Sequence, residues 1–443
     1  MNINLIRISE IVFPMLLFSP GLRGLGLFYY LFLGASFIFS IPLISSSYLK
    51  IFKSKFLTIL VIFYIITGIG LISSFDEYNL SAILFSLSRI SLCIIFVFVF
   101  NSYKNKLSTN KITKYYLIAT FIASSFIYIQ FFIGPIDFFS EPFSMRTGLP
   151  RFSTTSGSTN IFSVSVAFSI LISTFIKDRI NFFRSSIVLL IYQLFILGAA
   201  VTNLSRTGMF ASVGAFLFAR IYLFFKKLNS KFFEDIFIIP LRFKIFNFRL
   251  KVSQLLGSIF IGITFVTFSE MALRYIRTML FFLTDNKQLI MSYSDATFET
   301  RRLGPDIANR LVLFDPQFFA SLLDHPLYII FGGGSKYFGG TIGIPRGYSH
   351  NMFIDIFQAQ GFLGLLLFLF LLINLFNKSQ NSSFYKFNFS LDIRSLTITL
   401  LFIFLCTHNS GIIFHPLTVF PLLFVQDFLQ SSKPFEKKKE YLA

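Results

Sequence analysis

Residues 351–376 read NMFIDIFQAQGFLGLLLFLFLLINLF and contain a single charged side chain, Asp355. A helix needs about 20 predominantly apolar residues to cross the hydrocarbon core of a bilayer, and this stretch is long enough. It is apolar on every side and lacks the alternation of polar and apolar residues that a barrel strand shows. The stretch therefore predicts a membrane-spanning helix.

Similar apolar runs recur along the whole chain of 443 residues, of which 54% are hydrophobic and only 13% charged. A soluble domain carries about 25% charged residues, so this composition excludes a soluble enzyme, a secreted domain and a disordered tail. We expect an all-α, polytopic integral membrane protein with about twelve transmembrane helices. They lie near residues 4–22, 25–46, 56–73, 81–100, 115–133, 159–176, 184–201, 208–225, 254–270, 351–376, 394–407 and 411–429.

Two of these expectations leave an alternative open. The first run is interrupted by Arg7, Glu10 and Pro14, and without it the number of helices would be eleven. The break between the last two runs, 407–411, is short, so these two runs are alternatively a re-entrant pair.

The net charge of +19 follows the alternation of the loops. With the N-terminus in the cytoplasm, the alternate loops, the C-terminal tail and Arg7 near the N-terminus together supply 19 Lys and 6 Arg on that side, as the positive-inside rule requires. Most of the charge therefore needs no nucleic-acid partner. The same orientation gives nine transmembrane helices in 1–270, one large periplasmic loop in 271–350, three helices in 351–430 and a basic cytoplasmic tail in 431–443.

The cations predicted on the periplasmic side differ in type from those on the cytoplasmic side. Ten of them are Arg and only two are Lys. Orientation does not depend on which cation is used, whereas phosphate recognition does, since a guanidinium is planar and binds phosphate through two parallel hydrogen bonds. This enrichment favours an anionic ligand on that side. The alternative is that these arginines pair with lipid headgroups or carboxylates.

The large loop ends in a group of residues that suits proton transfer. Ser349, His350 and Asn351 stand at the outer end of the tenth helix, and His350 titrates near neutral pH, as a general base must. Asp355 lies one turn further, in the outer half of the membrane, where an acid is unusual. It is expected to orient His350 or Asn351, or to pair with an arginine such as Arg89. The run FGGGSKYFGG at 331–340 lacks the P-loop pattern and is either a flexible turn cluster or a backbone-amide nest for phosphate.

The short loop before the eighth helix reads Ser205-Arg206-Thr207-Gly208. Gly208 is expected to permit a tight turn, with Ser205 or Thr207 capping the helix. Arg206 at a helix N-terminus is unfavourable for the helix dipole unless an anion binds there as well. His408 and His415 are interpreted as structural. The two cysteines lie in apolar runs and form no disulfide framework or zinc motif.

At these residues the chain resembles the O-antigen polymerase and O-antigen ligase superfamily of bacterial inner-membrane glycosyltransferases. Three stretches carry the resemblance. The tetrapeptide Ser205–Gly208 is similar to the family's SRTG/SRTA signature, and His350-Asn351, nine residues, Gly361, two residues and Gly364 fit H-[NSQ]-x9-G-x2-[GTY]. The third stretch is similar to the family's R…hPl…G.G pattern and comprises Arg310, Asp324-His325-Pro326-Leu327 and Gly332-Gly333-Gly334.

The resemblance implies a glycosyltransferase type C-like, multi-pass enzyme of the inner membrane whose active site faces the periplasm. It implies metal- and cofactor-independent transfer of a glycan from undecaprenyl pyrophosphate to a sugar hydroxyl, with membrane lipids and a chain-length regulator protein as further partners. His350 is then the base or the group that orients the acceptor. The implied substrate-binding residues are Arg206 and Arg310 for the pyrophosphate, with Arg89, Arg151, Arg346, Asn351 and Asp355 as further candidates.

Polymerase and ligase share these motifs. The Phe- and Lys-rich composition is typical of polymerases from variable polysaccharide loci, which favours an O-antigen polymerase of lipopolysaccharide biosynthesis over a ligase that acts on lipid A core. A membrane transporter or lipid flippase is the alternative from another class. It predicts inverted repeats and broken helices in matching halves, and the sequence shows no repeat and one large loop.

Overall fold

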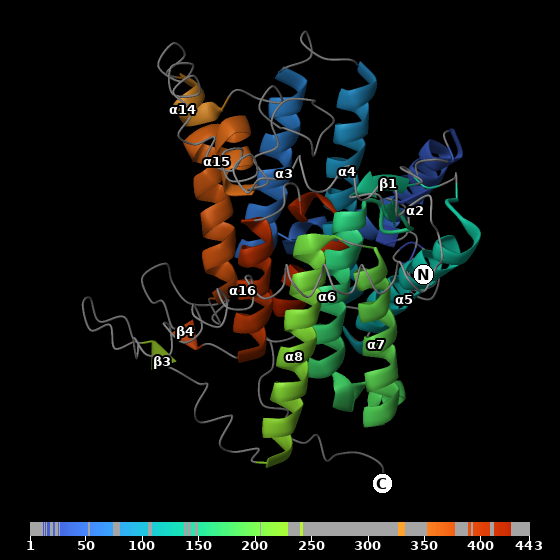
Figure 1. Ribbon diagram of the computed structural model, residues 1–443. Coiled ribbons are helices and arrows are strands. Elements are labelled where there is room, and N and C mark those ends of the chain that lie inside the picture. The colour runs from blue at the N-terminus through green and yellow to red at the C-terminus, as the bar shows by residue number, and fades with distance from the viewer. Residues whose placement is uncertain are drawn as a thin grey trace, which may run out of the picture.

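The structure is a computed structural model. It describes scattered positions between 12 and 25 and then residues 27–51, 54–73, 80–104, 109–136, 139, 143–146, 149–203, 205–228, 240–241, 327–332, 352–376, 389–390, 393–407 and 412–426. This part of the chain is predominantly helical, as Figure 1 shows, which confirms the expected all-α class. The ninth predicted run, 254–270, and most of the predicted loop 271–350 lie outside the described residues.

The described helices follow the predicted runs to within a few residues at most of their ends. The first are α2 (Leu27–Ile51), α3 (Lys55–Ser73), α4 (Leu80–Lys104) and α5 (Thr109–Ile133). The central group comprises α6 (Thr159–Phe175), the 3₁₀ turns η3 (Lys177–Arg179) and η4 (Asn181–Phe183), α7 (Ser186–Thr202) and α8 (Arg206–Leu228). The last are α14 (Leu327–Phe331), α15 (Met352–Phe376), α16 (Ile393–Cys406), η7 (Ile412–Phe414) and α17 (Pro416–Phe424).

Two described segments are long and apolar enough to cross a membrane, Asn110–Ile133 in α5 and Thr207–Phe224 in α8. The C-terminal helices are much shorter. At 1.5 Å per residue, α16 with 14 residues and α17 with 9 measure about 21 and 14 Å, less than the ~30 Å of a hydrocarbon core. Every residue of α17 is buried inside the protein, so this helix belongs to the core. The re-entrant pair therefore stays an alternative to two transmembrane helices here.

Two short strand pairs lie between the described helices, outside the predicted apolar runs. Strands β1 (Phe143–Arg146) and β2 (Leu149–Phe152) pair antiparallel just before α6, with Arg146 opposite Leu149 and Ser144 opposite Arg151. A second, two-residue pair joins β3 (Pro240–Leu241) to β4 (Phe389–Ser390). This pairing satisfies backbone groups that lie outside the helices.

Helix α6 is the centre around which α5, α7 and α8 pack (Figure 1). Its serines repeat along the sequence, and such small side chains let helix backbones approach closely in membranes. Gly208 of α8 lies so close to Ser163 of α6 that a Cβ atom would collide with the serine side chain. The Oγ of Ser212 donates to the carbonyl of Ser163 at 3.0 Å. The expectation of a tight turn at Gly208 was therefore wrong: the residue is helical and permits close packing.

Aromatic side chains hold η7 and α17 inside the bundle. The hydroxyl of Tyr64 in α3 donates to the carbonyl of Ile413 at 2.6 Å, and the neighbouring Phe63 stacks on Phe414 with ring centroids 5.9 Å apart. Tyr116 of α5 stacks on Phe420 of α17 at 4.4 Å. The core thus joins the first helices of the chain to the last ones.

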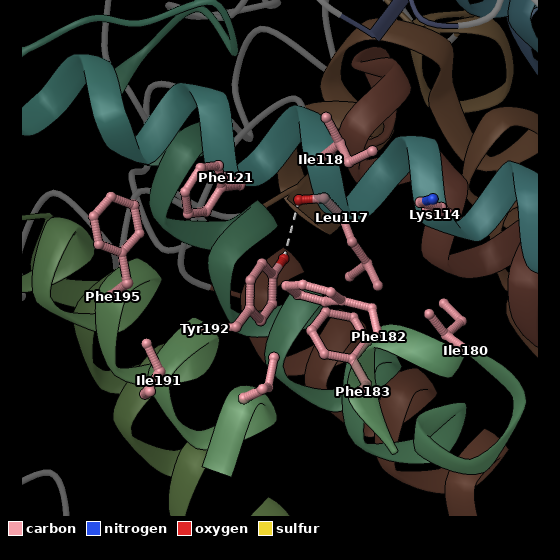
Figure 2. Close-up of a pocket in the computed structure, with 11 residues that line it drawn as sticks. Lys114, Leu117, Ile118, Phe121, Ile180, Phe182, Phe183, Ile191, Tyr192 and Phe195 are labelled. Carbon is pink, nitrogen blue, oxygen red and sulfur yellow. Dashed lines mark hydrogen bonds between the residues drawn. The ribbon is translucent and has the colours of Figure 1, made fainter. Parts of the chain in front are cut away.

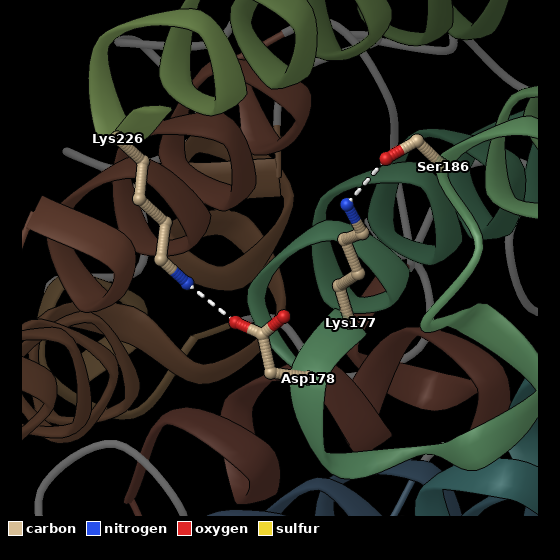
Figure 3. A network of polar contacts seen from close by, with 4 residues as sticks. All are labelled: Lys177, Asp178, Ser186 and Lys226. Atoms are coloured by element: carbon tan, nitrogen blue, oxygen red, sulfur yellow. Dashed lines mark hydrogen bonds and ion pairs between the residues drawn. The ribbon is translucent and has the colours of Figure 1, made fainter. Parts of the chain in front are cut away.

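One end of the central helices gathers basic residues (Figure 3). Lys226 near the end of α8 pairs with Asp178 in η3 at 2.7 Å, and Lys177 donates to Ser186 at 2.6 Å. The hydrogen bond and charge of Lys226 lower the pKa of the Asp178 carboxyl below its usual value. Partial burial, and then the nearby charge of Arg394 in α16, lower the pKa of Arg179. The structure thus brings together residues from three loops that the sequence places in the cytoplasm.

Candidate functional site

The opposite end of α6, α7 and α8 is a buried polar junction. Asn203 ends α7 and is fully buried, and its Oδ1 accepts a hydrogen bond from the backbone N–H of Phe152 in β2 at 2.9 Å. The Oγ of Ser205 donates to Oδ1 of Asn160, in the first turn of α6, at 2.9 Å. These two bonds fix the α7–α8 connection against β2 on one side and against α6 on the other.

This junction brings two predicted phosphate-binding residues together along the backbone. Arg151 directly precedes Phe152, and Arg206 is the first residue of α8, three positions after Asn203. The structure places their backbones and describes neither side chain. The sequence offers no period or spacing that relates residue 151 to residue 206, so this proximity could not be predicted from it.

A buried loop of small polar residues continues the junction toward α6. Ser153, Thr154, Thr155 and Ser156 are all buried, and Thr154 exchanges two backbone hydrogen bonds with Gly157. The φ of Gly157 is +87°, a region that favours glycine. The loop is held from outside as well, because the side-chain amide of Gln130 donates to the carbonyl of Ser153 at 2.9 Å and Gly21 donates to that of Thr155 at 3.0 Å.

Arg89 and His415 complete this region. His415 is 3% exposed, and its Nδ1 accepts a hydrogen bond from the N–H of Leu417 at 3.2 Å, which caps α17. This cap fits the structural role expected of His415. Arg89 of α4 and the backbone of Ser156 are close enough to act on the imidazole, although Nε2 has no hydrogen bond of normal geometry among the described residues. No pattern in the sequence indicates that these residues meet.

The arrangement suits an anion. Arg89 is half-buried in α4, and a cation at membrane depth requires polar partners or a wet cavity. The buried 153–156 loop belongs to the same region, because the backbone of Ser156 and the charge of Arg89 both act on the imidazole of His415. Fixed cations and hydroxyls in a water-poor site can stabilise negative charge that develops on a phosphate leaving group.

The two glycines of the stretch that begins at His350, Gly361 and Gly364, serve close packing. Gly361 has a φ of +65° at a kink in α15, and a Cβ atom there would collide with the backbone of Ile330 and Gly332 beside α14. Gly364 leaves room for the side chain of Gln360, which donates to Oγ1 of Thr67 in α3. The sequence stretches 326–334 and 350–364, which carry separate parts of the family resemblance, are therefore in contact at Gly361.

The remaining predicted site residues are placed as follows. Asp355 is 2% exposed, near the start of α15. Helix α15 begins at Met352, directly after Asn351. Outside the described residues lie His350, Asn351, Arg310 and Arg346, so their roles stay predictions.

Within the described ranges, no group of three or more His, Cys, Asp or Glu side chains is placed to hold a metal ion. No family model, curated protein or solved structure matches the chain. Its function is therefore inferred from its residues and their arrangement.

Proposed function

We propose that this chain is an O-antigen-type polysaccharide polymerase of the bacterial inner membrane. It transfers a glycan from undecaprenyl pyrophosphate to a sugar hydroxyl of a lipid-linked repeat unit, on the periplasmic face. The proposal combines the motif resemblance with twelve membrane helices, fewer if the last two form a re-entrant pair. The basic end around Asp178 and Lys226 faces the cytoplasm, and the polar junction at the other end of α6 faces the periplasm.

The observation that carries the proposal is the hydrogen bond between Phe152 and Asn203. It brings the backbone positions of Arg151 and Arg206 to one junction, at the end of the central helices opposite to the basic cluster. Two guanidinium groups at one junction suit a pyrophosphate, whose two phosphates each accept paired hydrogen bonds. The buried Ser/Thr loop and Arg89 extend the same polar region.

The proposed transfer uses the arginines of the junction and His350. The acceptor hydroxyl oxygen forms a bond to the anomeric carbon of the donor, and the bond from that carbon to the pyrophosphate oxygen breaks. The electron pair leaves with undecaprenyl pyrophosphate, whose negative charge the arginines stabilise. His350 takes the hydroxyl proton, or orients the hydroxyl while water takes it.

The experiment is a transfer assay with purified protein and undecaprenyl-pyrophosphate-linked oligosaccharide, in which products are separated by glycan length. Wild-type protein is expected to give a ladder of longer lipid-linked glycans. Arg151→Lys and Arg206→Lys should each lower the rate by about 10–150-fold, since one lost charge-assisted contact is worth about 1.5–3 kcal/mol. Arg179→Lys, at the opposite end of the bundle, is the matched control and should keep the wild-type rate.

A double variant sharpens the test. If Arg151 and Arg206 hold the same pyrophosphate, the double Lys variant should lose less than the product of the two single losses. Lys variants that elongate glycan at the wild-type rate would remove the phosphate role. His350→Ala should abolish transfer, or lower it by about 10²–10⁴-fold, in protein that remains folded.

The same assay separates the alternatives. When lipid A core is added, a ligase would move the glycan to that acceptor, whereas a polymerase would continue to lengthen the lipid-linked chain. A transporter or flippase would move the lipid-linked oligosaccharide across a liposome bilayer without changing its length.

A further inference from the structure

An apolar groove of about 630 Å³ runs between the first halves of α5 and α7 (Figure 2). The 3₁₀ turn η4 closes one side of it with Phe182 and Phe183. Most of the lining is aliphatic or aromatic, and of the lining residues only Lys114 is charged. The hydroxyl of Tyr192 does not add a free polar group, because it donates to the backbone carbonyl of Leu117 at 3.1 Å.

The groove begins at the basic end of the bundle. Helices α5 and α7 both start there, and Lys114 lies five residues into α5 with an exposed side chain. Lining residues then continue along α5 as far as Phe121, about 10 Å further at the helical rise. Figure 2 shows Lys114 at one end of this row of side chains and Phe121 further along it.

The groove is open to its surroundings on the side away from the core. Phe182 and Ile191 are 64% and 62% exposed, and Phe121 is 42% exposed. On a membrane helix, the medium that meets such side chains is lipid. A lipid tail gains little by exchanging hydrocarbon for an apolar groove, because lipid tails are as apolar as leucine. Selective retention of one lipid therefore requires its headgroup.

We propose that this groove binds one anionic phospholipid of the leaflet at the basic end. Its acyl chain lies along Phe121 and Ile191, and its headgroup phosphate pairs with the ammonium of Lys114. The charge of Lys114 at one end and the apolar lining beyond it match the two parts of such a lipid. The site is independent of the proposed transfer reaction, which is assigned to the opposite end of α6.

The chain contains no Trp, so one introduced Trp reports on a single place. Phe121→Trp puts the reporter in the groove. Leu217→Trp is the control, because Leu217 faces outward from α8 with 47% exposure and is not among the groove-lining residues. Each variant is reconstituted in phosphatidylcholine vesicles, and quenching is compared for brominated phosphatidylglycerol and brominated phosphatidylcholine at equal mole fraction.

Quenching at Phe121→Trp should show a preference of about fivefold for phosphatidylglycerol over phosphatidylcholine, since one Lys near the membrane surface attracts an anionic lipid by about 1 kcal/mol. Quenching at Leu217→Trp should show no such preference. Adding Lys114→Gln should abolish the preference. Lys111 is an exposed lysine one turn away that does not line the groove. Lys111→Gln should therefore leave most of the preference for phosphatidylglycerol unchanged. High salt should reduce the preference. Thermal unfolding in detergent checks that each variant is folded.

Three outcomes would overturn the proposal. Equal quenching by the two lipids at Phe121→Trp would show a lipid-facing surface without selectivity. A preference that survives Lys114→Gln would place the headgroup elsewhere. Protection of Phe121→Trp from both brominated lipids would show that another protein surface, such as a second copy of the chain, covers the groove.

Discussion

Gly361 of α15 packs directly against the backbone of Ile330 in α14, with no room for a Cβ atom between them. The φ of Gly361 is +65°, so the residue also holds a backbone conformation that favours glycine. Helix α15 begins two residues after His350. The packing at Gly361 thus connects two segments. One is α15, which follows the predicted base His350, and the other is the chain at Ile330 and Gly332.

We expect Gly361→Ala to destabilise the protein and to lower transfer. The added methyl group meets backbone atoms, which cannot move aside as a flexible side chain can, and a positive φ adds about 1 kcal/mol for a residue with a Cβ atom. Thermal unfolding in detergent and the glycan ladder measure the two effects.

Gly34→Ala is the control for this substitution. A Cβ atom on Gly34, inside α2, meets nothing within 4 Å, and Ala has a higher helix propensity than Gly. Its stability should be unchanged or slightly raised. A Gly361→Ala protein that unfolds at the wild-type temperature and makes wild-type glycan would show that α14 does not pack on α15 in this way.

Much of the fold can be predicted from the sequence because apolar runs recur along it and most are separated by polar or charged loops. The ends of α3 and α15 agree with the predicted runs to within one residue. Such runs carry no information about which helices meet, because they are apolar all round. The central position of α6 and the burial of α17 therefore had to come from the structure.

The candidate site was predictable in residue type and not in arrangement. An excess of Arg over Lys indicated an anion, whereas the contact of β2 with the α7–α8 connection depends on one long-range bond between Phe152 and Asn203. The sequence predicts a turn at Gly208 because glycine is common in turns. Its actual role depends on Ser163, 45 positions earlier in the chain, which no local pattern reveals.

Gly208→Ala should separate α6 from α8. The new methyl group collides with Ser163, and overpacking of this kind costs about 1–3 kcal/mol. Gly214→Ala in the same helix is the control, since a Cβ atom there meets nothing within 4 Å. Thermal unfolding of the two variants in the same detergent measures the difference, and equal melting temperatures would contradict the close α6–α8 packing.

Asn203→Ala should detach β2 from the α7–α8 connection. The variant leaves the buried N–H of Phe152 without its acceptor, at a cost of about 1–3 kcal/mol. If Arg151 and Arg206 act on one pyrophosphate, transfer should also fall, and a higher donor concentration should partly restore it.

Thr202→Ala is the matched control for Asn203→Ala. The hydroxyl of Thr202 bonds only to the carbonyl of Gly198 in its own helix among the described contacts, so its loss should have a much smaller effect on both stability and transfer. An Asn203→Ala protein with reduced stability and an unchanged apparent affinity for the donor would separate this junction from substrate binding.

The pair of Asp178 and Lys226 should make stability depend on pH at the basic end. The pKa of Asp178 is lowered, first by the hydrogen bond from Lys226, so the carboxylate form is favoured by folding. A group of this kind contributes stability above its unfolded pKa of about 3.9, and the contribution is lost as pH falls through the lower folded value. Because the two side chains are 67% and 45% exposed, we expect the pair to contribute at most about 1 kcal/mol to the free energy of unfolding.

Asp178→Asn should therefore lower the unfolding temperature slightly at pH 7 and not at pH 2.5. Lys226→Gln should cause the same loss at pH 7, and the double variant should lose no more than either single one. A difference between wild type and Asp178→Asn that is as large at pH 2.5 as at pH 7 would show that the carboxylate form of Asp178 does not stabilise this end of the bundle.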